Sequence, residues 1–265
     1  MGEVFVVTGA ASGIGAAVAR KLRQRGDTVI GVDLAEPASG VVDEHVHMNQ
    51  ADLASIDAAV AGLPSGVAGL VNSAGVPPAE RFPPAEVLRI NFYGLREFTR
   101  RYLPEISRGG AIVNLSSAAG MGWMQNAELL GEALAIEDLD AVDEFVTRRG
   151  IHNEGMGNLA AYPISKQLLI AWTASAFPVW QETGVRMNAL APSAVATPIL
   201  DDFLAAFGEV AAKRMQAIGA STPDDVAKVA LILLDPDYDW INGATIPLER
   251  GTKSYGGLAE LGLAG

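Results

Sequence analysis

The chain has 265 residues, 49% of them hydrophobic, a formal net charge of −12 and no cysteine. This length can bury a sizeable core, in one large α/β domain or two small ones. The negative charge argues against a nucleic-acid or anionic-membrane partner, and the lack of cysteine excludes disulfides and thiolate chemistry. No apolar run reaches the ~18 residues that span a bilayer, and no basic leader precedes the first apolar stretch. We therefore expect a cytoplasmic protein.

Residues 3–8 are a short, apolar, β-branched run that predicts a buried strand. A glycine-rich turn follows, with Gly9, Gly13 and Gly15, and then a helical pattern over residues 16–25. Glycines at such a turn let the backbone approach a pyrophosphate, whose charge is favourable at the helix N-terminus. The spacing is Gly-x-x-x-Gly-x-Gly and not the usual Gly-x-Gly-x-x-Gly, so a purely structural turn is the alternative.

A second predicted strand, residues 28–32, ends at Asp33. A carboxylate about 20 residues beyond the glycines is placed to accept hydrogen bonds from an adenosine ribose. It would repel a 2′-phosphate, and no Arg or Lys follows the turn to bind one. Asp33 therefore favours NAD(H) over NADP(H); its alternative role is to cap a turn at the strand end.

Five further strands are expected at residues 45–48, 69–71, 111–115, 185–190 and 244–248, with helices between them. One long helical segment, residues 86–106, is interrupted near Asn91 and Gly94. Alternating strands and helices predict an α/β fold: a single-domain, Rossmann-type, doubly wound parallel sheet with helices on both faces, over residues 1–265. Ligands of such sheets gather at the carboxyl ends of the strands, where Asp33, Asn72 and Ser116-Ser117 lie.

Two other polar sites have competing interpretations. Asp52, followed by Leu53, either reaches an adenine edge or caps a helix beginning near Ser55. His45 and His47 share one face of a predicted strand, but with no third ligand nearby we expect them to be structural and predict no metal site.

A helical insert is expected at about residues 120–157. Its two apolar stripes consist of Leu129, Leu130, Ala133, Leu134 and of Leu139, Val142, Phe145, Val146. Seven carboxylates fall between Glu128 and Glu144. This acidic run is interpreted as a solvated face, with a lid or an assembly surface as the alternatives.

Tyr162 and Lys166 are four positions apart, so a helix places them one turn apart on one face. A fixed ammonium beside a phenol lowers a phenol pKa that starts near ~10. Such a phenol can exchange a proton with a carbonyl or alcohol oxygen. Taken alone, such a pair is more often an aromatic ring beside a solvated amine.

Together these motifs resemble the short-chain dehydrogenase/reductase family, in order and over nearly the whole chain. The matching motifs are Thr8-Gly-x-x-x-Gly-x-Gly15, Asn72-x-Ala-Gly75, Asn91, Ser117, Tyr162-x-x-x-Lys166 and Pro192. The chain is most similar to the bacterial 3α-hydroxysteroid dehydrogenase/carbonyl reductase group, whose members carry a comparable helical insert and a Gly-Asn-Leu-Ala segment like that at residues 157–160. Ser193 and Arg250 depart from the usual glycines of the family.

The resemblance implies an acid/base role for Tyr162, assisted by Lys166. Ser117, the second of the Ser-Ser pair, would bind the substrate oxygen, and Asn91 would hold a water in a proton relay. The residues implied to bind NAD are Gly9, Ser12, Gly13, Ile14, Gly15, Asp33, Asp52, Leu53, Asn72, Ala74, Gly75, Tyr162, Lys166, Pro192, Val195 and Thr197. The cofactor carries out the redox step and the protein supplies proton transfer and orientation.

The implied reaction is hydride transfer between a secondary alcohol and NAD+. Apolar residues near the expected mouth predict a hydrophobic alcohol or ketone: Met121, Trp123, Met124, Ile199, Leu200 and Phe203. The alternatives are a regulatory protein that binds NAD without turnover, and an NAD-using epimerase or dehydratase. In the group that the chain resembles, the insert is associated with dimers, so we expect a homodimer in preference to a tetramer.

Overall fold

The computed structural model describes residues 2–155, 157–260 and 262–263. These residues form a seven-stranded sheet in the order β3-β2-β1-β4-β5-β6-β7, and every neighbouring pair is parallel. The strands are β1 (Val4–Thr8), β2 (Thr28–Asp33), β3 (Glu44–His47), β4 (Val67–Asn72), β5 (Ile106–Leu115), β6 (Arg186–Pro192) and β7 (Thr245–Leu248). The predicted doubly wound, single-domain fold is confirmed.

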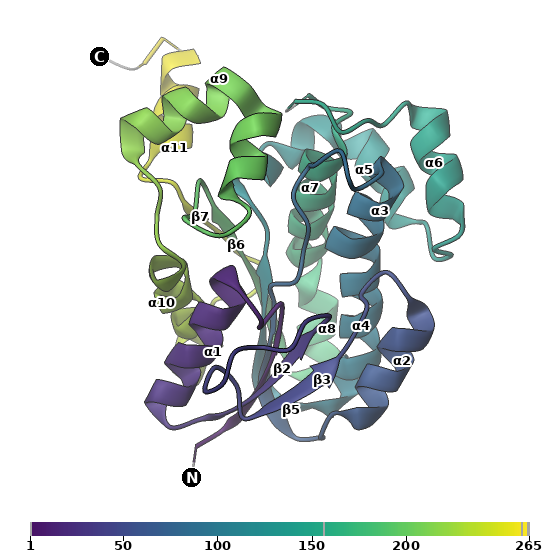
Figure 1. The fold of residues 1–265 in the computed structure, drawn as a ribbon, viewed down its shortest axis with the longest axis vertical. Helices are drawn as coiled ribbons and strands as arrows, with labels where there is room; N and C mark the ends of the chain where they lie inside the picture. Colours follow the sequence, from purple (N-terminus) through teal and green to yellow (C-terminus); the bar gives the residue numbers. More distant parts are fainter. Residues whose placement is uncertain (1, 156, 261, 264–265) are drawn as a thin grey trace.

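Helices cover both faces of the sheet (Figure 1). They are α1 (Gly13–Arg25), α2 (Leu53–Gly62), α3 (Pro84–Leu88), α4 (Leu95–Tyr102), α5 (Ala127–Leu134), α6 (Ala141–Arg149), α7 (Ala161–Ala174), α8 (Ala176–Thr183), α9 (Leu200–Ile218), α10 (Pro223–Leu234) and α11 (Thr252–Glu260). No helix in the described part of the chain is both long and apolar enough to cross a bilayer.

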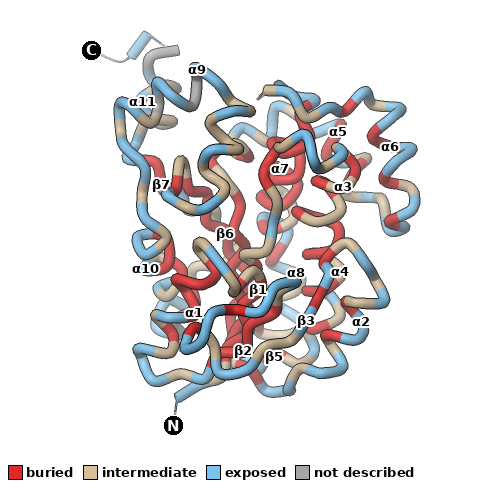
Figure 2. Tube along the Cα trace, viewed as in Figure 1, coloured by how far each residue is buried: buried red, intermediate tan, exposed pale blue. Residues whose placement is uncertain are grey.

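Strand alternation divides the core between the two faces. In β1, Phe5 and Val7 pack with α1 and α10, whereas Val6 packs on the opposite face with Ile56 of α2 and Phe98 of α4. Figure 2 shows the central strands as a continuous buried band with exposed helix surfaces around it. Because the central strands are buried on both faces, they are apolar almost throughout.

A π-helix (Arg89–Gly94) joins α3 to α4 and accounts for the interruption predicted near Asn91 and Gly94. A Cβ on Gly94 would lie 1.7 Å from the carbonyl oxygen of Gln50, so this position tolerates only glycine. π-Helical turns inside longer helices are frequent at functional sites. This one places Asn91 beside the loop that follows β4.

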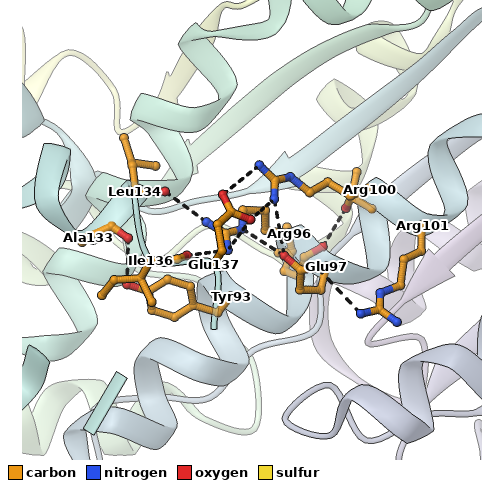
Figure 3. A network of polar contacts seen from close by, with 11 residues as sticks. Tyr93, Arg96, Glu97, Arg100, Arg101, Ala133, Leu134, Ile136 and Glu137 are labelled. Atoms are coloured by element: carbon orange, nitrogen blue, oxygen red, sulfur yellow. Dashed lines mark hydrogen bonds and ion pairs between the residues drawn. The ribbon is translucent and has the colours of Figure 1, made fainter. Parts of the chain in front are cut away.

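The helical insert is confirmed over its described residues; residue 156 lies outside them. Leu129, Leu130 and Val142 are buried with Leu168 and Leu169 of α7, so the insert packs onto α7. Arg96 of α4 is 1% exposed and donates to the carbonyl oxygens of Leu134, the last residue of α5, and of Ile136 just beyond it, at 3.2 and 2.7 Å (Figure 3).

The acidic run of the insert is largely paired with arginines. Glu137 contacts Arg100 at 2.7 Å, and Asp143 pairs with Arg89 from the π-helix. Both carboxylates nevertheless stay 66% exposed. The run is therefore solvated, as expected, but it also docks the insert against the arginines of the preceding helix, which its sequence pattern did not indicate.

Candidate functional site

A cavity of about 410 Å³ lies at the carboxyl ends of the strands. Its walls come from the turn between β1 and α1, the ends of β2, β4, β5 and β6, one face of α7 and the first half of α9. Parallel strands bring their carboxyl ends to one edge of the sheet, and this is where ligands of such folds bind. Most of the predicted site residues line this cavity: Gly9, Ser12, Gly13, Ile14, Asp33, Ala74, Gly75, Ser117, Tyr162, Lys166, Pro192, Val195 and Thr197.

The glycine-rich turn is tightly packed against the loop after β4. Gly9 has φ +68°, and a Cβ there would lie 2.7 Å from the amide nitrogen of Ala74. A Cβ on Gly15 would lie 2.1 Å from the carbonyl oxygen of Gly9, so a glycine here lets the helix pack closely against the turn. Gly15 does not itself line the cavity. Ser12, the N-cap residue of α1, makes no side-chain cap bond. The first amides of α1 can therefore face an anion.

Asp33 lies between the turn and the end of β2. Its Oδ2 accepts a hydrogen bond from the amide of Ala11 at 2.9 Å, and its Oδ1 accepts one from the amide of Ala35 at 3.0 Å. The side chain thus does cap the strand end, and it also lines the cavity beside the turn. Both interpretations of Asp33 fit the structure, because a carboxylate has lone pairs left for a ribose hydroxyl.

Besides Gly15 and Asn91, the predicted residues Asp52, Leu53 and Asn72 lie outside the set that lines the cavity in the described chain. Asp52 accepts a hydrogen bond from the amide of Ala54 at 2.9 Å and caps α2, which begins at Leu53. Asn72 is buried, and its amide donates to Thr99 and to Asn114 at 2.9 Å each. Asp52 therefore has the capping role, and Asn72 braces the sheet against α4.

The helix α7 carries Tyr162 and Lys166 into the cavity beside Ser117. The Lys166 Nζ lies 5.6 Å from the centroid of the Tyr162 ring and donates to the carbonyl oxygen of Leu115 at 3.0 Å. Both serines border the cavity, but their hydroxyl groups have different partners: that of Ser116 donates to the carbonyl oxygen of Lys166, whereas that of Ser117 hydrogen-bonds to the phenol. This geometry supports Ser117, and not Ser116, as the serine that meets substrate.

The phenol pKa differs from the expectation. Burial raises the pKa of Tyr162 to about 12, and the hydrogen bond with Ser117 acts in the opposite direction. Burial also lowers the pKa of Lys166 to about 8, so its positive charge is not fixed. The prediction of a lowered phenol pKa is therefore wrong for the protein without ligand, because desolvation outweighs the hydrogen bond with Ser117.

The side-chain oxygen and nitrogen of Asn91 both form hydrogen bonds with the backbone of Val76. Its Oδ1 accepts from the amide of Val76 at 2.8 Å, and its Nδ2 donates to the carbonyl oxygen of Val76 at 3.0 Å. A Cβ on Gly75 would lie 3.0 Å from the Asn91 Oδ1 and 3.7 Å from the Lys166 Nζ. Asn91 thus holds the loop after β4 close to Lys166, and its role in a proton relay stays a prediction.

The first half of α9 covers the apolar end of the cavity. Phe203 lies edge-on to the Tyr162 ring with centroids 5.0 Å apart, and the Phe207 centroid lies 6.0 Å away. Ile199 and Leu200 line the cavity as well. The predicted mouth residues of the insert do not: Met121, Trp123 and Met124 are absent from the described lining, and Met124 is 71% exposed.

Other lining residues were not predicted. They are Val32, Leu34, Met48, Asn49, Gln50, Ser73, Val76, Ile90, Leu115, Ala118, Ala119, Ala194, Pro198, Leu204 and Phe207, together with the departure Ser193 and with Ser116. Phe207 was detectable, because residues four positions apart share a helix face and Phe203 was already a candidate. Most of the others are unremarkable apolar residues next to strand ends, and no sequence pattern distinguishes them.

Comparison with known proteins agrees with this geometry. A family model described as short chain dehydrogenase matches residues 3–128, and one described as Enoyl-(Acyl carrier protein) reductase matches residues 147–253. A coniferyl-alcohol dehydrogenase from Pseudomonas sp. (strain HR199 / DSM 7063) is 36% identical, over 94% of this chain and 96% of the relative. A 3-alpha-hydroxysteroid dehydrogenase/carbonyl reductase from Comamonas testosteroni is 30% identical, over 94% and 96%.

The solved structures agree with the sequence comparison. The crystal structure of a 3-alpha-hydroxysteroid dehydrogenase from Pseudomonas sp. B-0831 complexed with NADH has a TM-score of 0.79 to this chain at 28% identity, covering 92% of this chain and 94% of the other. Family motifs, fold and the grouping of Ser117, Tyr162 and Lys166 thus all point the same way. The protein belongs to the short-chain dehydrogenase/reductase family, whose members are oxidoreductases with a nicotinamide cofactor.

Proposed function

We propose that the protein is an NAD(H)-dependent oxidoreductase that interconverts a hydrophobic secondary alcohol and the corresponding ketone. The observation that carries this proposal is that Ser117, Tyr162 and Lys166 line the same cavity as the glycine-rich turn and Asp33. The glycine-rich turn and the N-terminus of α1 would hold the pyrophosphate, and Asp33 the adenosine ribose. The nicotinamide, when bound, supplies or accepts the hydride.

The protein's own groups would handle the proton. The Tyr162 phenol gives a proton to the carbonyl oxygen in reduction and takes it from the alcohol in oxidation, and the Ser117 hydroxyl hydrogen-bonds to the same oxygen. The hydrogen bond from Lys166 to Leu115 fixes the ammonium below the phenol. A dry site such as this one strengthens both interactions, because the local dielectric is low.

The substrate end of the cavity favours an uncharged molecule. Among the described lining residues, Asp33 and Lys166 are the only ones with charged side chains, and Asp33 belongs to the turn at the other end. The wall above Tyr162 consists of Val76, Ile199, Leu200, Leu204 and the two phenylalanines of α9. The relatives' printed substrates, coniferyl alcohol and hydroxysteroids, are both hydrophobic alcohols. An assay panel should therefore contain aromatic alcohols and hydroxysteroids, followed through the absorbance of NADH in both directions.

The choice of cofactor tests the Asp33 argument. A 2′-phosphate would meet a carboxylate already held in place by Ala11 and Ala35, so we expect kcat/KM for NADH to exceed that for NADPH by about tenfold or more. Asp33→Asn keeps the shape of the side chain and removes its charge, and should bring the ratio of kcat/KM for NADH to that for NADPH closer to one. Equal or better use of NADPH by the wild-type enzyme would contradict the proposal.

A further inference from the structure

The first half of α9 blocks direct access to the Tyr162 phenol. Phe203, Leu204 and Phe207 line the cavity, and Tyr162 is only 6% exposed beneath them. Phe203 is close enough to Tyr162 to make an edge-to-face contact. A substrate with a bulky ring system can therefore reach the phenol only if this part of α9 moves away.

Two partly buried phenylalanines, Phe203 and Phe207, pack the first half of α9 onto the core, and the rest of its described side chains add little to this contact. None of its described side chains is buried, over a helix of 19 residues. Gly208 interrupts the helix with φ +53° and ψ −136°, and a Cβ there would meet nothing within 4 Å. Segments with few buried contacts open at low free-energy cost. The residues before Gly208 can thus move as a unit while Arg250, which donates to the carbonyl oxygen of Ile218 at 2.9 Å, holds the far end of the helix.

Besides the phenylalanine contacts, one polar side-chain pair among the described residues ties the movable half of α9 to the rest of the molecule. Arg81 donates two hydrogen bonds to the Asp202 carboxylate, at 2.9 and 2.7 Å, across 121 positions of sequence. The Arg81 loop is itself well anchored: Asn91 holds Val76 at its beginning, and Asn153 of the insert donates to the carbonyl oxygen of Phe82. A fixed loop is therefore joined, through two parallel hydrogen bonds, to a weakly packed helix.

We propose that the Arg81–Asp202 pair is a clasp that holds α9 closed over the active site, and that its opening about Gly208 sets the access of bulky alcohols. The claim about access of alcohols rests on the proposed function. The claim that the pair holds α9 closed does not. An exposed ion pair of good geometry supports a shift of about two- to fivefold in the ratio of open to closed forms.

Hydrogen–deuterium exchange of the peptide covering residues 200–207 tests the clasp in the purified protein without substrate. Arg81→Met keeps the aliphatic stem and removes the charge, and should raise exchange of this peptide about two- to fivefold. Asp202→Asn should do the same, and the double variant should do no more than either single one, because both remove one interaction. The differences should shrink at 1 M salt, where the screening length is ~3 Å.

Glu209→Gln is the matched control. Glu209 pairs with Lys213 within α9, at 3.2 Å, and among the described residues neither forms a hydrogen bond or ion pair with the Arg81 loop. The control should leave exchange of residues 200–207 at the wild-type rate. Unchanged exchange in Arg81→Met, or an equal rise in Glu209→Gln, would overturn the clasp.

Kinetics then test the consequence for access. The ratio of kcat/KM for a polycyclic alcohol to that for a small secondary alcohol should rise about two- to fivefold in Arg81→Met and stay unchanged in Glu209→Gln. Failure to oxidise any alcohol would contradict the proposed function, while the exchange measurement would still decide the clasp. Faster exchange with an unchanged ratio would contradict the role of the clasp in access.

Discussion

The environment of Tyr162 is apolar and disfavours loss of the phenol proton. Its ring is enclosed by Phe203 and Phe207, and its hydroxyl has Ser117 as partner. Burial raises its pKa to about 12, so at neutral pH the protein without ligand holds a neutral phenol. That state is ready to donate a proton in carbonyl reduction. Alcohol oxidation needs the opposite state, and should gain speed as pH rises.

Substitution of Tyr162 should separate chemistry from binding. Tyr162→Phe removes the transferable proton and leaves the ring contacts, so we expect kcat to fall by about 10²–10⁴-fold with NADH affinity largely kept. Turnover assays and tryptophan-fluorescence titration with NADH measure the two quantities. Ser116→Ala is the control, because within the described part of the chain that hydroxyl bonds to the backbone of Lys166 and not to the phenol. Retention of more than about a tenth of kcat would mean that another group transfers the proton.

Lys166 should leave a signature in the pH dependence of stability. Burial lowers its pKa from 10.5 to about 8, so between these values the unfolded chain binds more protons than the folded chain. Stability therefore rises with pH across this window, and the cost of burying the charged amine is fully present below it. The Lys166→Met variant lacks the amine and therefore lacks this pH-dependent contribution to the free energy of unfolding. The free energy of unfolding of the wild type, relative to that of the variant, should increase by roughly 2–3 kcal/mol between pH 7 and pH 10.

Urea unfolding of both proteins at the two pH values measures this difference, because other titrating groups are common to both. Stopping at pH 10 also avoids the opposite contribution of Tyr162, whose raised pKa removes stability only as the pH climbs from 10 towards 12. A difference that does not change with pH would show that the Lys166 amine is not desolvated in the folded protein.

Sequence reasoning was strongest where a residue type follows from backbone geometry. Gly9 and Gly15 were identifiable because the turn leaves no room for a Cβ, and the Tyr162–Lys166 spacing specifies a shared helix face. Asn72 and Asp52 show the limit. Each stands at a strand or helix end in the pattern of a ligand contact, yet each side chain is used within the fold, by Thr99 and Asn114 or by the amide of Ala54. Which of two polar groups reaches a cavity depends on side-chain packing that no local pattern encodes.

At the scale of elements, the insert is joined to α4 by a buried guanidinium. Arg96 stacks on Phe92 and Tyr93, with its central carbon 5.6 and 5.4 Å from the ring centroids, and binds Leu134 and Ile136 through their carbonyl oxygens. The Tyr93 hydroxyl adds a bond to the carbonyl oxygen of Ala133 at 3.0 Å. These contacts end α5 and position the chain that leads into α6.

Removal of this guanidinium should loosen the insert. Arg96→Met keeps the packing of the stem but leaves both carbonyl oxygens without their donor, so we expect a loss of roughly 2 kcal/mol in the free energy of unfolding. Arg100→Met is the matched control. Arg100 is about half-exposed and binds only carboxylates, so its loss should cost well under 1 kcal/mol. Equal effects in chemical denaturation would mean that Arg96 does not anchor the insert.

Element types were more predictable than element boundaries. In the sequence, Thr222 followed by Pro223 and two acidic residues is a pattern that indicates the start of a helix, and the structure has both reciprocal bonds of a capping box where α10 begins. The helix after Tyr162, by contrast, is broken at Ser175 into α7 and α8 within an uncharged run that has no stop signal. The C-terminal helix α11 was not predicted, because its sequence contains two adjacent glycines at 256 and 257, which disfavour a helix. Its first turn is capped by Glu249, whose carboxylate accepts a hydrogen bond from the Lys253 amide at 2.7 Å.

For the whole molecule, the insert limits how copies can associate. Its buried leucines pack on α7, and its carboxylates pair with arginines of α4, so parts of both helices are covered. Two copies meeting here would also place the remaining acidic surface of each insert against the other, which is unfavourable. We therefore propose a homodimer built on another surface. Light scattering should give about twice 27.6 kDa, and a stable mass near four times this value would mean that the insert leaves a tetramer surface free.

The strand order also determines how the chain must be assembled during synthesis. The first strand made, β1, ends up near the middle of the sheet, between β2 and β4. β2 follows soon after it, but β4 (Val67–Asn72) leaves the ribosome much later. Until then one edge of an apolar strand has unpaired amides and carbonyls, which is a template for pairing with another nascent chain. Parallel pairing over such distances is slow. The same arrangement that gathers the site at one edge of the sheet therefore leaves a strand edge unpaired during synthesis, and such an edge can pair with another chain.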